Sequence, residues 1–199
     1  EAKDFEEFRF EEPVKDGFYV AAADCAKEKD YTVISVMRYD CAPARLVYWM
    51  RVNRRPYPMM IDWFNKAIRD YDALAIHDAT GLGNVVNDYL DIRAKGFLMN
   101  RPDRDNMLSE YVSAVENDKV RVAKIKTAYI GPKYCQVGDL YARGQEYHLP
   151  DEVCSLALAW RVIKRNFAGG APTSLVVPRS PEPRPLDRAF APPPLEAKK

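Results

Sequence analysis

Three aspartates stand where a predicted strand or helix meets a loop. Asp24 ends the apolar run 18–23, Asp78 ends the run 73–77, and Asp151 opens a helical segment after Pro150. Carboxylates delivered from three distant parts of a chain suit hard divalent cations, which take oxygen ligands. Paired cations held in this way are common apparatus for cutting phosphodiesters. The sequence therefore contains candidate ligands for a metal-dependent hydrolytic centre.

Two of these aspartates also have ordinary structural explanations. Asp24 could simply close a turn after a strand, as aspartate often does. Asp151 follows a proline at the start of a helix, where the helix dipole favours acidic side chains. Each of these two residues is a candidate metal ligand only because the other aspartates occur with it.

The segment after Asp78 allows a second interpretation. Gly81 and Gly83 resemble part of a dinucleotide-binding loop, but Val86 occupies the third glycine position and the unit is not the first βα unit of the chain. We favour a site at the carboxyl end of the strand, where ligands of open α/β sheets gather. His77 should point to the opposite face of that strand as a packed side chain.

Several basic side chains are candidates for contacts to a phosphate backbone. Lys27 and Lys29 lie in the short turn after the first aspartate and could steer phosphate. Lys124 and Lys126 alternate, so they would share one face of a strand and could line a backbone groove. His148 is a possible proton or phosphate contact. A solvated surface is the alternative for each of them.

Composition sets few limits on function. The 199 residues carry a formal net charge of +1, so the overall charge does not indicate nucleic-acid binding. Bound metal ions would themselves add positive charge to an acidic site. The four cysteines are too scattered for a zinc pattern, and we expect reduced thiols in a cytosolic protein.

Neither a membrane span nor a signal peptide is evident in the sequence. The chain starts with Glu1, so we expect a fragment of something longer. Residues 1–16 are interpreted as a linker or N-terminal arm, 17–170 as the folded domain, and 171–199, which hold eight of the fifteen prolines, as an extended or disordered tail.

Hydrophobic periodicity predicts an α/β fold with a mixed sheet. The expected elements are a meander of strands 18–24, 31–39 and 44–53, a helix 59–71, a strand 74–77, a helix 83–95, a strand 96–99, a helix 103–117, a hairpin or flap within 120–137, and a helix 150–167.

Three motifs together resemble the nuclease domain of the large terminase subunit of tailed phages, a branch of the RNase H-like (RuvC-like) nucleases. They are Asp24-x-Ala-x-x-Lys-Asp30, Asp78-x-Thr-Gly-x-Gly83 and Asp151-x-x-x-Ser-Leu-Ala-Leu-Ala159, within a match over residues 17–167. The first motif lacks the loop glycines usual in the family. Pro150 stands where the family usually has a further acid.

The resemblance implies an RNase H-like mixed central sheet flanked by helices, with the strands ending at Asp24 and Asp78 side by side. It implies two Mg²⁺ or Mn²⁺ ions, with Asp24 bridging them and Asp78 and Asp151 each helping to hold one. The expected substrate is concatemeric double-stranded DNA, cut with little sequence preference. Expected partners are an ATPase motor domain of the same polypeptide, a portal protein and a small terminase subunit, acting in the host cytoplasm.

Two other functions stay open. A Holliday-junction resolvase or transposase-type nuclease would use similar acids and would prefer branched DNA. A non-catalytic module would dock on DNA or a portal protein through its basic edge and proline-rich tail, without metal-dependent cutting.

Overall fold

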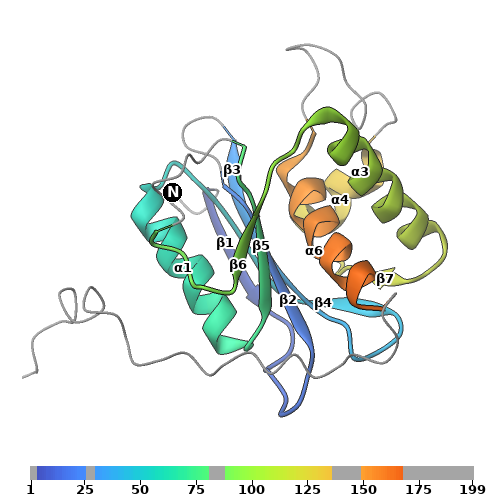
Figure 1. Ribbon diagram of the computed structural model, residues 1–199, viewed down its shortest axis with the longest axis horizontal. Helices are drawn as coiled ribbons and strands as arrows, with labels where there is room; N and C mark the ends of the chain where they lie inside the picture. Colours follow the sequence, from blue (N-terminus) through green and yellow to red (C-terminus); the bar gives the residue numbers. More distant parts are fainter. Residues whose placement is uncertain (1–3, 26–29, 81–87, 136–148, 168–199) are drawn as a thin grey trace, which may run out of the picture.

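A seven-stranded mixed sheet forms the centre of the computed structural model, which describes residues 4–25, 30–80, 88–135 and 149–167 (Figure 1). The strand order is β1-β4-β3-β2-β5-β6, and β7 pairs with β4 off this path. The strands are β1 (Phe5–Arg9), β2 (Tyr19–Asp24), β3 (Tyr31–Arg38), β4 (Ala44–Asn53), β5 (Leu74–Asp78), β6 (Ala94–Phe97) and β7 (Val120–Arg121).

The predicted meander is confirmed, because β2, β3 and β4 pair antiparallel in sequence order. The chain then crosses over through a helix, so that β5 pairs with β2 in parallel, and β6 pairs with β5 in parallel. This crossover brings the carboxyl ends of β2 and β5 to the same edge of the sheet.

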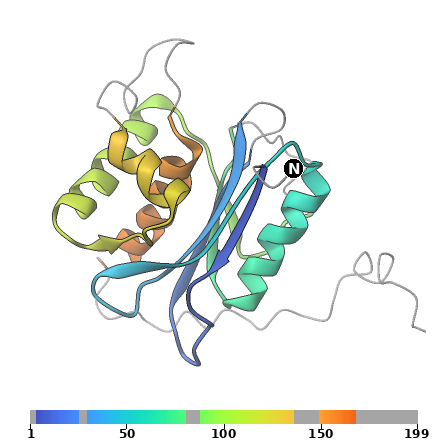
Figure 2. The same cartoon turned by 180° about the vertical axis from the view of Figure 1, so that it is seen from behind.

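Helices cover the two faces of the sheet unequally. In the part of the chain that the structure describes, α1 (Tyr57–Asp70) lies on one face, and α3 (Arg101–Glu116), α4 (Lys126–Tyr134) and α6 (Asp151–Phe167) lie on the other (Figure 1, Figure 2). None of these helices is long and apolar enough to cross a bilayer.

Strand β2 is buried on both faces, and its side chains alternate between two cores. Val20 and Ala22 belong to the core under α6, whereas Ala21 and Ala23 belong to the core under α1. The same alternation places Asp24 on the α6 face.

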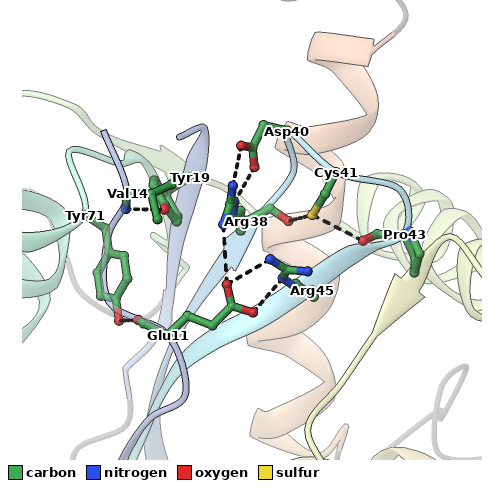
Figure 3. Close-up of polar contacts among 9 residues, drawn as sticks. All are labelled: Glu11, Val14, Tyr19, Arg38, Asp40, Cys41, Pro43, Arg45 and Tyr71. Atoms are coloured by element: carbon green, nitrogen blue, oxygen red, sulfur yellow. Dashed lines mark hydrogen bonds and ion pairs between the residues drawn. The ribbon is translucent and has the colours of Figure 1, made fainter. Parts of the chain in front are cut away.

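The predicted N-terminal arm contains strand β1, which pairs antiparallel with β4 over five residues. Glu11, just beyond it, contacts two arginines, with distances of 2.6 Å from Oε1 to Arg45 Nε and 3.5 Å from Oε2 to Arg38 Nη1 (Figure 3). The hydroxyl of Tyr71 donates to the Glu11 carbonyl at 2.8 Å. The arm is therefore bound to the sheet, and strand β1 was missed by the sequence pattern.

The prediction of a helix over 83–95 is wrong for its described part. Residues 88–93 form turns, and strand β6 begins at Ala94, two residues before the predicted strand 96–99. Asn65 of α1 accounts for this: its amide donates to the Tyr89 carbonyl at 2.8 Å and accepts from the Asp91 amide at 2.7 Å. Side-chain bonds of this kind compete with helical ones. Tyr89 in these turns is 55% exposed, and residues 83–87 lie outside the described residues.

The prediction of a hairpin or flap within 120–137 is also wrong. Apart from the two-residue strand β7, the described part of this segment contains helix α4. Thr127 ties the helix to the sheet, since its hydroxyl accepts from Trp49 Nε1 at 3.2 Å and donates to Glu6 at 2.6 Å. Ala128 is fully buried in the α6-side core. These long-range contacts outweigh the turn preference of the Gly131-Pro132 sequence, which lies within the helix.

The helix prediction for 103–117 is confirmed by α3. The predictions for 59–71 and 150–167 are confirmed by α1 and α6. The proline-rich segment 171–199 lies outside the described residues, and the domain boundaries stay a prediction.

Candidate metal centre

Asp24 and Asp78 end neighbouring parallel strands. The register pairs Ala22 with Ile76 and Ala23 with His77, so the two aspartates follow at the same level. Ala22 and Ile76 belong to the core under α6, and a period of two residues returns both aspartates to that face. The two carboxylates therefore leave the sheet side by side, toward α6.

Helix α6 brings Asp151 to the same edge. Four residues into the helix, the Ser155 hydroxyl lies 2.8 Å from the Ser35 hydroxyl and donates to the Ala22 carbonyl at 3.2 Å. Both serines are fully buried, so this contact fixes the first turns of α6 over β2 and β3. At its start, Asp151 Oδ2 accepts a 2.8 Å hydrogen bond from the amide of Tyr31.

The charges of the two other aspartates act on Asp24. Burial raises the pKa of Asp24 to about 8, a hydrogen bond from Cys154 opposes the rise, and the charges of Asp151 and Asp78 add to it. Like charges that share a site disfavour ionisation in this way, and a bound cation would reverse the effect.

Three carboxylates supply the oxygen ligands that hard divalent cations prefer. Within the described ranges, however, no three His, Cys, Asp or Glu side chains are gathered closely enough to hold a metal ion. Asp24, Asp78 and Asp151 are the side chains whose chemistry would suit such a cation.

Cys154 is a neighbour of the centre that sequence reasoning missed. Burial and the charge of Asp24 raise the pKa of its thiol, which stays protonated and hydrogen-bonds to the Asp24 carboxylate. The spacing of three residues from Asp151 could have found it, because residues i and i+3 share a helix face.

The structure assigns no role to the basic residues and the histidine that the sequence offered as phosphate contacts. Lys27, Lys29 and His148 lie outside the described residues. Lys124 and Lys126 are both exposed, but the strand on which their pairing was argued is absent, because Lys126 begins α4.

His77 is buried on the face opposite Asp78, as the strand period predicts. Its neighbour two residues earlier, Ala75, belongs to the core under α1. The glycines of the alternative dinucleotide loop lie outside the described residues.

Neither a protein-family model nor a characterised protein matches this sequence. Solved structures do match it. The large terminase nuclease from thermophilic phage G20c with bound magnesium has a TM-score of 0.66 and 24% identity, over 78% of this chain and 86% of that one. The G20c nuclease has also been solved with zinc and with cobalt.

Two further phage proteins share the architecture. The large terminase nuclease domain of Thermus phage P74-26 matches with a TM-score of 0.63 and 23% identity, over 77% of this chain and 84% of that one. The HK97 bacteriophage large terminase matches with a TM-score of 0.55 and 11% identity, over 78% of this chain and 43% of that one. This chain has the RNase H-like fold of the nuclease domains of phage large terminases.

Proposed function

We propose that this chain is a metal-dependent DNA endonuclease that cuts concatemeric double-stranded DNA during phage DNA packaging. The proposal is supported by the convergence of β2, β5 and the start of α6 at one edge of the sheet, which brings Asp24 within electrostatic reach of Asp78 and Asp151. The shared fold with terminase nuclease domains supports it, as does the divalent metal in the G20c structures.

The three aspartates would hold two ions, Mg²⁺ or Mn²⁺, with Asp24 contributing to both and Asp78 and Asp151 to one each. Two bound cations supply charge stabilisation for the phosphodiester under attack and lower the pKa of the attacking water. The chain's own part is to fix the carboxylates on rigid elements, Asp24 and Asp78 on paired strands and Asp151 through its bond from Tyr31.

The exposed Lys124 and Lys126 are proposed to contact the DNA backbone beside α4, with Lys27, Lys29 and His148 as further contacts. Backbone contacts carry no sequence information, so cutting would show little base preference. Replacing Lys124 and Lys126 with alanine would weaken binding across sequences and lower the salt slope by about one unit per lost contact. An unchanged slope would return both lysines to ordinary solvated surface.

The biological setting is proposed on the same basis. The nuclease would work in the host cytoplasm beside an ATPase motor domain of its own polypeptide, with a portal protein and a small terminase subunit as partners. Residues 171–199 would be dispensable for cutting, since their composition cannot build a core.

A plasmid-nicking assay with Mg²⁺, Mn²⁺ or EDTA tests the proposal. We expect cutting with either metal and none in excess EDTA. DNA binding without metal-dependent cutting would favour a docking module instead. A strong preference for a four-way junction over linear duplex would favour a resolvase.

A further inference from the structure

Arg51 of β4 stands in the same row of the sheet as Asp24. Asp24 pairs with Val33 of β3, and Val33 pairs with Arg51. Directly opposed residues on antiparallel strands present their side chains on one face, and Val33 belongs to the core under α6. Arg51 therefore faces the helix that carries Asp151, two strand spacings or about 10 Å from Asp24.

Two contacts join Arg51 to the surroundings of Asp151. Its Nε donates to Glu152 Oε1 at 2.6 Å, and Glu152 adjoins Asp151 in sequence. Its guanidinium carbon lies 3.2 Å from the centre of the Tyr31 ring. The amide of Tyr31 is the group that donates to Asp151 Oδ2 at 2.8 Å. Arg51 thus contacts Tyr31, whose amide donates to Asp151, and Glu152, which follows Asp151 in the helix.

The Arg51–Glu152 pair is largely shielded from water, with side chains 17% and 11% exposed. Removing one partner of such a pair leaves an uncompensated buried charge. Glu152 without Arg51 would be a largely buried, unpaired acid directly after Asp151 in the chain. The ion pair therefore balances the charge of Glu152 and directs its carboxylate toward Arg51.

We propose that Arg51 is a positioning residue of the candidate metal centre, which fixes the Tyr31–Asp151 hydrogen bond and holds Glu152 out of the ligand set. The expected effect of Arg51 on metal affinity rests on the proposed function. The hold on the Tyr31–Asp151 bond does not, and it can be measured without metal.

The experiment compares Arg51→Gln, Glu152→Gln and the double variant with a matched control, Arg45→Gln. Arg45 belongs to the same strand and pairs with Glu11 through the same atoms at the same 2.6 Å, but at the opposite end of the sheet. Both positions thus test the loss of an arginine–glutamate pair on β4, and the Arg45 pair is the more exposed of the two.

The first measurement is hydrogen exchange of the Tyr31 amide in EDTA. Exchange is expected to be several-fold faster in Arg51→Gln and in the double variant, and unchanged in Arg45→Gln. The second is the Mn²⁺ concentration that gives half of the metal-induced thermal stabilisation. That concentration is expected to rise about tenfold or more in the double variant, as for other residues that orient metal ligands.

Wild-type exchange at Tyr31 together with a wild-type Mn²⁺ midpoint in the double variant would overturn the proposal. So would an equal change in Arg45→Gln. Should Arg51→Gln fail to fold, the double variant decides, because it leaves no unpaired buried charge. Should the wild type neither gain stability from Mn²⁺ nor cut DNA, the proposed function fails, and Tyr31 exchange alone decides the role of Arg51.

Discussion

Acidic side chains are paired with arginines at one end of the central sheet, whereas at the other end three aspartates lie near one another in the sheet topology. At the end where β3 finishes and β4 begins, acids and bases are matched: Arg38 pairs with Asp40 at 2.6 Å, and Arg45 with Glu11 at 2.6 Å (Figure 3). At the other end, Asp24 lies within electrostatic reach of Asp78 and Asp151.

The pKa values follow this difference. The hydrogen bond from Arg38 lowers the pKa of Asp40. Burial and neighbouring acids raise the pKa of Asp24 to about 8. Strand β3 contributes to both ends, so the contrast is a property of local side-chain choice rather than of the fold. Matched charge stabilises one end, whereas unmatched charge at the other is retained at a cost, as is typical of functional sites.

The largest expected effect is on cleavage. Asp24→Asn, Asp78→Asn and Asp151→Asn should each lower the nicking rate about 100-fold or more, because metal catalysis supplies several kcal/mol of barrier reduction. DNA binding, measured by gel shift, should be largely kept. Glu11→Gln at the matched end should cut at the wild-type rate. Survival of cleavage at any two of the three aspartates would end the nuclease hypothesis.

Metal should also separate the two ends in stability. A divalent cation at 100 times its dissociation constant adds about 2.7 kcal/mol to the free energy of unfolding. Asp24→Asn, Asp78→Asn and Asp151→Asn should gain markedly less from Mn²⁺ than the wild type, and Glu11→Gln should gain as much. Differential scanning calorimetry with and without Mn²⁺ measures both. Equal gains in all variants would place the ion elsewhere.

The pH dependence in EDTA should have opposite signs at the two ends. The raised pKa of Asp24 means that its contribution to stability is full below about pH 4 and is lost as the pH rises through about 8. Asp24→Asn should therefore be more stable than the wild type above about pH 8. The contribution of Asp40, with its lowered pKa, is present above the ordinary carboxyl range and is lost on acidification.

Urea midpoints across this pH range provide the check. Asp40→Asn should lose stability at neutral pH, where Asp24→Asn loses none. The comparison fails if both variants shift stability in the same direction at every pH.

The smallest effect is expected from Glu11→Gln on stability. Its pair with Arg45 is partly exposed, with side chains 32% and 41% accessible, and such pairs contribute about 0.2–1 kcal/mol. A urea titration resolves a loss of that size. A much larger loss would mean that the arm holds more of the fold together than its ion pairs suggest.

The sequence predicted those elements whose apolar pattern is strong and local. Strands β2 to β4 and helices α1 and α6 have such patterns, and the three aspartates were found at their boundaries. The pairing of β2 with β5, expected from the family resemblance, is confirmed. The role of the three aspartates stays a prediction.

Long-range side-chain contacts explain what the sequence could not predict. Helix α4 depends on Thr127 reaching Glu6, 121 residues away, and the turns after residue 87 depend on Asn65. Arg51 and Glu152 are 101 residues apart. The hydrophobic periodicity of a short segment carries no information about such distant pairs. The contacts around Asp151 therefore could be identified only from the structure.

Strand β1 also has a mechanical consequence. Its five residues pair antiparallel with the middle and end of β4, from Phe5 opposite Val52 to Arg9 opposite Tyr48. A pull on the chain ahead of Phe5 along the strand axis loads these pairs together, in shear, instead of opening them one at a time. Resistance to such a pull is governed by the rate of detaching the whole strand. The arm can therefore transmit tension into the same strand that carries Arg51.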